Sequence, residues 1–271
     1  MKKTLVALSL AAMTLPALAQ DKKAPEPDYT ITGNFGIVSD YRFRGISQSD
    51  KDPAIQGGVD FAHKSGVYLG NWNSSVSDWA GTVHGSGIEM DFYGGFKTEV
   101  AGVGLDFGAI YYYYPGAKHT TTTLNPVNTR EIYLGAGYGP FSVKISRTIS
   151  DRYFGIGKEN DTSLMKSASS SAKGTMYYDL SFSKEIADKT TLKIHAGLLD
   201  IANRNTATST IKDFSVGVSY DLSGWILGLT YADTSGINTS DERTFFTNTN
   251  TTGRSVKLYE GAAILSLTKT F

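Results

Sequence analysis

Many short stretches of the chain alternate between apolar and polar residues, with the apolar ones recurring at every second position. The last stretch, Tyr259–Phe271, shows the pattern, since Leu265 and Leu267 alternate with Ser266 and Thr268. A period of two is that of a β-strand, whose side chains point alternately to opposite faces. Each stretch therefore predicts a strand with one apolar face and one mostly small or polar face.

The same alternation predicts twelve strands. The predicted strands are Tyr29–Arg44, Ile55–Phe61, Tyr68–Val76, Ile88–Phe96, Val103–Tyr113, Ile132–Tyr138, Phe141–Ile149, Met176–Phe182, Leu192–Leu198, Phe214–Tyr220, Trp225–Tyr231 and Tyr259–Phe271. The third is the weakest, because both of its faces carry apolar residues. The first is longer than the roughly 9–11 residues that a tilted strand needs to cross a bilayer. An even strand number is typical of single-chain bacterial barrels.

The connections between these strands alternate between short and long. The short ones are His63–Gly66, Lys97–Gly102, Gly139–Pro140, Lys184–Thr190 and Asp221–Gly224. The long ones are Gly45–Asp52, Ser77–Gly87, Pro115–Asn128, Phe154–Lys173, Asp200–Thr210 and Asp233–Arg254. Outer-membrane barrels have short periplasmic turns and longer extracellular loops. The pattern therefore predicts a barrel in the cell outer membrane with both termini in the periplasm.

The absence of long apolar runs narrows the fold class. Past residue 19, no run approaches the roughly 18 consecutive apolar residues that indicate a spanning helix. A chain that crosses a bilayer without such helices must close its sheet, because an open edge would leave backbone groups unpaired in lipid. We therefore expect an all-β, transmembrane, antiparallel up-and-down β-barrel. A soluble β-sandwich is the alternative, since its hairpins also carry many aromatic residues.

The first residues of the chain predict export from the cytoplasm. Lys2 and Lys3 form a positive segment, Leu5–Leu15 is apolar, and Ala17–Ala19 matches an A-x-A cleavage site. Residues 20–28 are polar and contain proline. The predicted organisation is a signal peptide at 1–19, a periplasmic leader at 20–28 and an outer-membrane barrel at 29–271.

Charge and cysteine content exclude several function classes. The chain carries 26 basic and 26 acidic side chains. This balance argues against a nucleic-acid partner, which would normally require a basic patch. Cysteine is absent, so no disulfide, thiolate metal site or thiol nucleophile is available. We expect no cofactor and no structural metal.

Three segments near the first strand resemble a known family. Ser39–Gln48, Pro53–Asp60 and Ser65–Trp72 look like the opening of the TorF family of porins, which are bacterial outer-membrane proteins. Beyond about Val100 the likeness is only of general barrel character. The resemblance implies a barrel with a pore, and it supplies no catalytic residues.

The strand phase predicts a set of charged residues on the inner face. The candidate channel-lining residues are Arg42, Arg44, Asp60, Glu89, Asp91, Asp106, Glu131, Lys144, Arg152, Asp179, Lys193, His195, Asp213 and Glu260. A lumen with both signs of charge either forms a constriction that sorts solutes by charge or is cross-linked by structural ion pairs. Both interpretations remain open at this stage.

Arg42 and Arg44 suggest one form of selectivity. They lie two residues apart near the end of the first predicted strand, so they share one face of it. That face is the inner one, just before the Gly45–Asp52 loop. Two fixed positive charges at the mouth would concentrate anions, unless carboxylates in the lumen neutralise them.

The function predicted from these features is passive diffusion of small hydrophilic solutes or ions through an outer-membrane channel. One alternative is a closed barrel with a structural or surface-recognition role. A lipid hydrolase is a further alternative, but no G-x-S-x-G motif accompanies the four histidines. Expected partners are outer-membrane lipid and lipopolysaccharide, the solutes, and the barrel-insertion machinery, which would read the terminal Phe271.

Overall fold

The computed structural model describes residues 27–77, 85–118, 127–158, 164–167, 169–205, 210–249 and 253–271. The predicted signal peptide and nearly all of the predicted leader lie outside these residues. No helix in the described ranges is long and apolar enough to cross a membrane.

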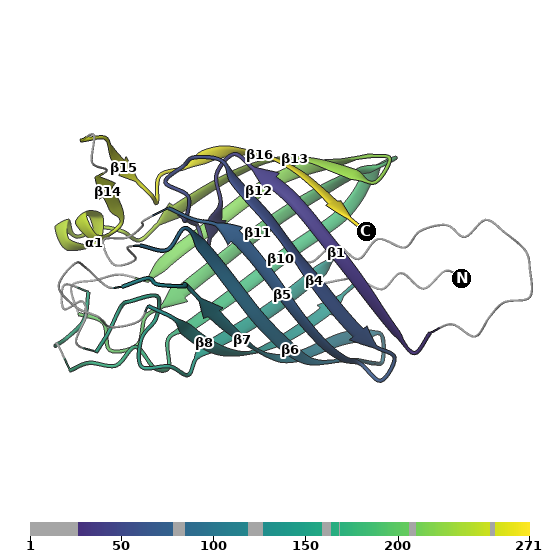
Figure 1. The fold of residues 1–271 in the computed structure, drawn as a ribbon, viewed down its shortest axis with the longest axis horizontal. Helices are drawn as coiled ribbons and strands as arrows, with labels where there is room; N and C mark the ends of the chain where they lie inside the picture. The colour runs from purple at the N-terminus through teal and green to yellow at the C-terminus, as the bar shows by residue number, and fades with distance from the viewer. Residues whose placement is uncertain are drawn as a thin grey trace, which may run out of the picture.

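Twelve strands form one closed antiparallel barrel, so the predicted fold class is confirmed (Figure 1). The barrel strands are β1 (Tyr29–Val38), β4 (Ala54–His63), β5 (Val67–Ser75), β6 (Ile88–Val100), β7 (Val103–Tyr113), β8 (Thr129–Tyr138), β9 (Phe141–Thr148), β10 (Met176–Ala187), β11 (Thr190–Asp200), β12 (Ile211–Leu222), β13 (Trp225–Ser235) and β16 (Ala262–Thr270). Strands that follow one another in the barrel pair with each other, and β1 pairs with β16 to close it.

At one end of the barrel, where β1 begins and β16 ends, tight turns connect the strands. We call this the short-turn end. Ala101 and Gly102 join β6 to β7, and Ser223 and Gly224 join β12 to β13. All four residues have positive φ angles. Two-residue hairpin loops prefer this conformation, because its twist matches that of the paired strands. The sequence places glycine second in both turns for this reason.

The opposite end, which we call the long-loop end, carries the small elements (Figure 1). The loop between β1 and β4 contains β2 (Arg42–Phe43) and β3 (Ile46–Ser47). The loop between β13 and β16 contains α1 (Ser240–Phe245), β14 (Thr247–Thr249) and β15 (Ser255–Lys257).

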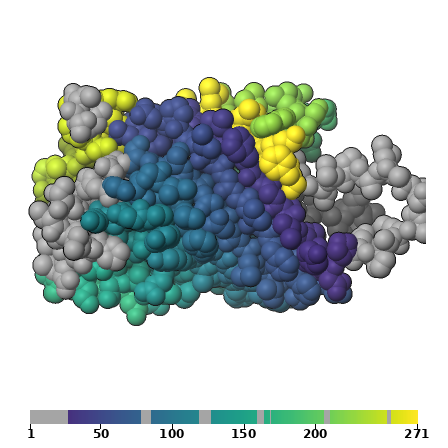
Figure 2. Space-filling model, viewed as in Figure 1, coloured from purple at the N-terminus to yellow at the C-terminus, as the bar shows by residue number. Residues whose placement is uncertain are grey.

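The outer surface of the barrel is apolar. Leu229 on β13 is 49% exposed and Leu265 on β16 is 57% exposed, whereas their neighbour Thr230 is half-buried on the inner side. Figure 2 shows that the outer side chains of the first strands, from purple to blue, form a continuous wall. Asn71 and Asn73 on β5 interrupt this face, and Asn73 donates a hydrogen bond to Asn71 at 2.7 Å.

Two predicted strand boundaries are wrong, namely the end of the first strand and the start of the last one. The first strand ends at Val38 and not at Arg44, because the chain leaves the sheet and turns into the lumen at Ser39. The last strand begins at Ala262 and not at Tyr259. There a turn closed by the Lys257–Glu260 ion pair, at 2.8 Å, precedes the sheet.

Candidate functional site

A hairpin that leaves the barrel wall and enters the lumen is the central feature of the long-loop end. It comprises residues 39–53, contains β2 and β3, and is called the plug hairpin below. Arg42 pairs with Ser47 and Phe43 pairs with Ile46. Arg44 and Gly45 form its tip, with φ angles of 48° and 80°. The plug hairpin thus has a two-residue loop of the same kind as the tight turns at the short-turn end.

Asp40 organises the base of the plug hairpin. Its buried carboxylate accepts a hydrogen bond from the Ser47 hydroxyl at 2.6 Å and one from Arg42 Nε at 2.8 Å. The Arg42 guanidinium also donates to the backbone oxygens of Gly45 and Glu260. Arg42 is therefore a neutralised structural residue, and not one that stands on a strand face of the lumen.

Arg44 connects the tip to the far wall of the barrel. Its guanidinium donates two hydrogen bonds to the Glu131 carboxylate on β8, at 2.9 and 2.6 Å, and stacks 4.3 Å above the Tyr177 ring on β10. In the order of the strands, β8 and β10 are each five strands away from β1, in opposite directions. The plug hairpin therefore crosses the whole lumen.

The backbone at the tip fits closely against a third part of the wall. The Gly45 carbonyl accepts a hydrogen bond from the Thr234 hydroxyl on β13 at 2.9 Å. A Cβ added to Gly45 would collide with Thr234 and would lie 2.5 Å from the Cβ of Asp213 on β12. Any larger residue here would push the tip away from the wall.

Aromatic rings close the space around the tip. Phe43 of the plug hairpin packs against Tyr112 on β7 and against Phe154, with ring centroids 5.3 and 5.1 Å apart. Tyr153 packs on Phe154 at 4.8 Å. A cavity beside Phe43 and Arg44 has a volume of only about 20 Å³, roughly the space for one water molecule. The plug hairpin and these rings therefore pack closely together at this level of the lumen.

Buried carboxyl groups surround the plug hairpin. Glu89 and Asp91 on β6, Glu131 on β8 and Asp213 on β12 are at most 6% exposed. Glu89 interacts with the hydroxyl of Tyr41 in the plug hairpin. The wall at this level is thus acidic, and Arg44 is the counter-charge that the plug hairpin supplies to Glu131.

His195 on β11 lies between two of the predicted carboxylates. Its Nδ1 is 3.2 Å from Asp179 and its Nε2 is 2.8 Å from Asp213. The Ser181 hydroxyl donates to Asp179 at 2.8 Å, and its oxygen lies 3.4 Å from His195 Nδ1. With a carboxylate at each nitrogen the ring serves as a double donor, so it is not placed to accept a proton from Ser181. The cluster is an ion-pair network across three strands.

The lumen near the short-turn end is lined by tyrosine–carboxylate pairs. Tyr68 on β5 donates to Asp106 at 2.6 Å, and Tyr93 on β6 donates to Asp60 at 2.6 Å. The Lys144 ammonium lies 5.1 Å above the Tyr133 ring. These groups, together with the exposed Lys193, make this half of the inner face polar.

Besides Arg42 and Arg44 in the plug hairpin, two more predicted lumen residues lie outside the barrel strands. Arg152 follows β9 in a loop, where it donates to the Lys158 carbonyl at 3.2 Å. The side chain of Glu260 is 51% exposed and pairs with Lys257. Placing them on strand faces was wrong, because the alternation continues into segments that turn away from the sheet. The hydrogen bond from Lys257 lowers the pKa of Glu260.

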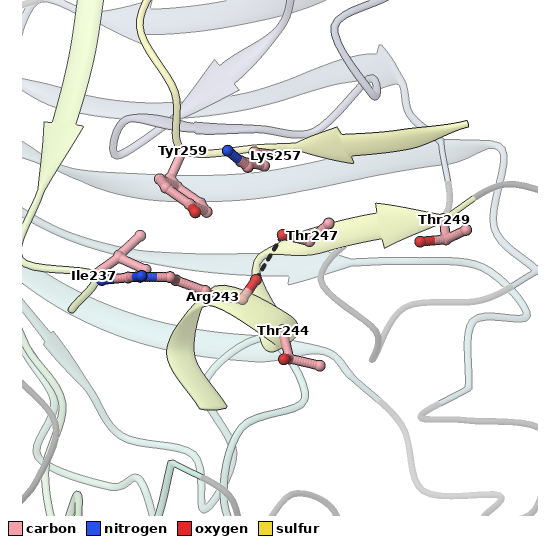
Figure 3. A pocket seen from close by; sticks show the side chains of 7 residues that line it. All are labelled: Ile237, Arg243, Thr244, Thr247, Thr249, Lys257 and Tyr259. Atoms are coloured by element: carbon pink, nitrogen blue, oxygen red, sulfur yellow. Dashed lines mark hydrogen bonds between the residues drawn. The ribbon is translucent and has the colours of Figure 1, made fainter. Parts of the chain in front are cut away.

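A second concavity, which the sequence did not indicate, opens on the outside of the long-loop end (Figure 3). Its volume is about 640 Å³, and it is lined by Ile237, Arg243, Thr244, Thr247, Thr249, Lys257 and Tyr259. Thr247 donates a hydrogen bond to the Arg243 carbonyl at 2.6 Å, as Figure 3 shows. Within the described residues, no group of three or more histidine or acidic side chains is arranged to hold a metal ion.

Comparison with known proteins gives the family. A family model described as "Bacterial protein of unknown function (Gcw_chp)" matches residues 22–271. The chain belongs to the Gcw_chp family. No curated protein matches this Gcw_chp chain. The TorF name suggested by Ser39–Trp72 is not confirmed by these comparisons.

Solved structures similar to this Gcw_chp protein include porins of low sequence identity. The NanC porin is 8% identical, with a TM-score of 0.50 over 89% of this chain and 99% of that one. The KdgM porin is 7% identical, with a TM-score of 0.49 over 89% and 99%. The likeness to NanC concerns the fold alone, and it agrees with the closed barrel described above.

Proposed function

We propose that this Gcw_chp protein is an outer-membrane channel for small hydrophilic solutes or ions. The observation that carries the proposal is the combination of a closed barrel, an apolar outer face and a polar, charged inner face. Only a closed barrel or a helix satisfies all backbone groups in lipid, and charges on the inner wall require water or partners there.

The lengths of the connections support an orientation of the barrel in the outer membrane. Long connections gather at one end and tight turns at the other, which in outer-membrane barrels are the extracellular and periplasmic ends. Both termini would then be periplasmic, and lipid and lipopolysaccharide would surround the apolar face. The porin character implied by the TorF resemblance fits this assignment.

A closed barrel with a recognition role is the second candidate, and the plug hairpin is the observation in its favour. In that case the plug hairpin would never leave, and binding would take place on the outer loops. The hydrolase alternative has less support, because Ser181 and His195 are both engaged with carboxylates.

Conductance in a planar bilayer tests the channel. We expect purified, refolded protein to produce discrete current steps, and a variant whose plug hairpin is replaced by a short linker to produce larger ones. Protein-free detergent is the control. A folded barrel that is silent both with and without the plug hairpin would refute the channel and leave the recognition role.

A further inference from the structure

We propose that the plug hairpin is a gate, and that its displacement exposes a ring of carboxylates that makes the open channel favour cations. This inference rests on the proposed channel function and names both its regulation and its solute class. Three observations carry it: the independence of the plug hairpin from the barrel sheet, the nature of its contacts, and the charges left behind it.

The plug hairpin is not part of the barrel sheet. β2 and β3 pair only with each other, in a separate two-stranded sheet. The barrel pairs β1 directly with β4, from Tyr29–His63 to Val38–Ala54, so the wall is complete without the plug hairpin. Its first residue is attached to the sheet, because the Ser39 amide donates to the Leu265 carbonyl on β16 at 2.8 Å. Residues 40–53 can move as a unit without breaking a hydrogen bond between two barrel strands.

Polar contacts and aromatic packing hold the plug hairpin in place. The tip is held by the Arg44–Glu131 ion pair and by the hydrogen bond from Thr234 to Gly45. Its base is held by Arg42 and by the Ser47 amide, which donates to the Leu258 carbonyl at 3.0 Å. Water can replace each of these polar partners. Displacement also separates the Phe43 ring from Tyr112 and Phe154, and this packing stabilises the closed position.

The charges that remain on the barrel wall determine which ions the open lumen favours. Arg42 already forms an ion pair with Asp40, and both residues leave together with the plug hairpin. Arg44 also leaves, and Glu131 loses its partner. The wall then carries five carboxyl groups against two cationic groups at and just below this level: Glu89, Asp91, Glu131, Asp179 and Asp213 against Lys144 and His195.

Cation preference follows from this balance. Rings of aspartate and glutamate select cations in channels, since they raise the local concentration of positive ions. Once hydrated, buried carboxyls such as Glu89 and Asp91 regain the solvent that favours their charged form. The expected preference is the reverse of that predicted from Arg42 and Arg44 in the sequence, because those two arginines belong to the plug hairpin and not to the wall.

A larger residue at the tip tests the gate. A Cβ added to Gly45 would collide with Thr234 and with the Cβ of Asp213, so Gly45→Val should hold the tip away from the wall. We expect Gly45→Val to conduct at least about tenfold more than the unchanged protein in a planar bilayer. Gly87→Val, where an added Cβ meets nothing within 4 Å, is the matched control, and heat-modifiable mobility shows that each variant is folded.

Two results of this experiment would overturn the gate. If folded Gly45→Val conducts like the unchanged protein, the position of the tip does not control the current. If Gly87→Val raises the conductance as much as Gly45→Val, the effect does not come from the tip.

Replacing residues 41–50 by a short Gly-Ser linker tests the selectivity separately. In a KCl gradient we expect the reversal potential to indicate a several-fold preference for K⁺. Adding Glu89→Gln, Asp91→Asn and Glu131→Gln should remove most of it. A preference for Cl⁻ would overturn the cation inference but leave the gate. A silent but folded linker variant would instead refute the channel function itself.

Discussion

At the scale of single residues, Arg44 shows why the chemistry of one side chain matters at the tip of the plug hairpin. Its planar guanidinium meets the Glu131 carboxylate with two parallel hydrogen bonds and still offers a face to the Tyr177 ring. Lysine, a compact charge without that plane, can supply only part of this arrangement. The side chains of the ion pair are 6% and 1% exposed, so neither charge has water as a substitute while the plug hairpin is in place.

Changing Arg44 should therefore release the plug hairpin. Truncating one partner of a buried ion pair costs about 3–5 kcal/mol, because the other charge remains buried. Glu131 can escape that cost only if water enters. We expect Arg44→Ala to raise open probability in single-channel recordings severalfold, and Arg44→Lys to have an intermediate effect. Lys64→Ala, at an exposed position of the short-turn end, is the control, and equal behaviour of Arg44→Ala and Lys64→Ala would contradict the prediction.

At the scale of elements, the apolar outer face determines which residues of a strand point outward, and glycine allows the backbone conformation of the tight turns. Leu229 and Thr230 are neighbours on β13 that face opposite sides of the wall. Gly224, in the turn that leads into β13, has a φ of 93° and no atom within 4 Å of an added Cβ. Substitutions at Leu229 and Thr230 therefore test the environment of the two faces. A substitution at Gly224 tests the backbone conformation alone, because an added side chain would make no contacts there.

Arginine substitutions on β13 should separate the two faces. On the lipid face of an outer-membrane barrel near the midplane, arginine costs about 2–4 kcal/mol, whereas polar surroundings tolerate it. We expect Leu229→Arg to lower the free energy of unfolding in lipid vesicles by that amount, and Thr230→Arg by much less. The measurement is a denaturant titration of folded barrel, and equal losses would show that the outer face is not in lipid.

Gly224→Ala should weaken the barrel through the backbone alone. An L-residue with a left-handed conformation costs roughly 1–2 kcal/mol. We expect a loss of that size in the free energy of unfolding. The matched control is Gly87→Ala, where an added Cβ also meets nothing within 4 Å but φ is not positive. If both variants lose the same stability, strain in the turn is not the cause.

At the scale of the whole molecule, the barrel depends on the seam between its first and last strands. The Phe271 amide donates to the Gly33 carbonyl at 2.8 Å, and the Gly33 amide donates to the Phe271 carbonyl at 3.2 Å. The Phe271 side chain itself is 67% exposed. The last residue thus combines a backbone role in closure with a side chain that is free for recognition.

Deleting Phe271 should reduce the amount of folded barrel in the outer membrane without changing export. Phe271→Ala keeps the two backbone hydrogen bonds and removes only the ring. A similar loss in both variants, measured by heat-modifiable mobility of membrane fractions, would assign the effect to recognition by the insertion machinery. A loss confined to the deletion would assign it to closure of the seam. Normal folded levels in both would rule out either role.

The sequence by itself determined the barrel, because the features that define it are local. A period of two determines the two faces of a strand, and glycine in a tight turn determines where a hairpin reverses direction. Neither feature depends on residues far away in the chain. The twelve strands and the alternation of short and long connections were predicted on this basis and are confirmed. Most of the charged inner-face residues also lie on strands of the barrel, as their register indicated.

Only the tertiary structure decided the state of the lumen. In Ser39–Arg44 apolar and polar residues continue to alternate, as in β1, because the aromatic rings inside the plug hairpin require the same spacing as a strand. Local pattern cannot distinguish a ring that faces lipid from one that packs inside the lumen. The partner of Arg44 lies 87 residues away on β8. Such a contact depends on closure of the barrel, which brings β8 opposite β1.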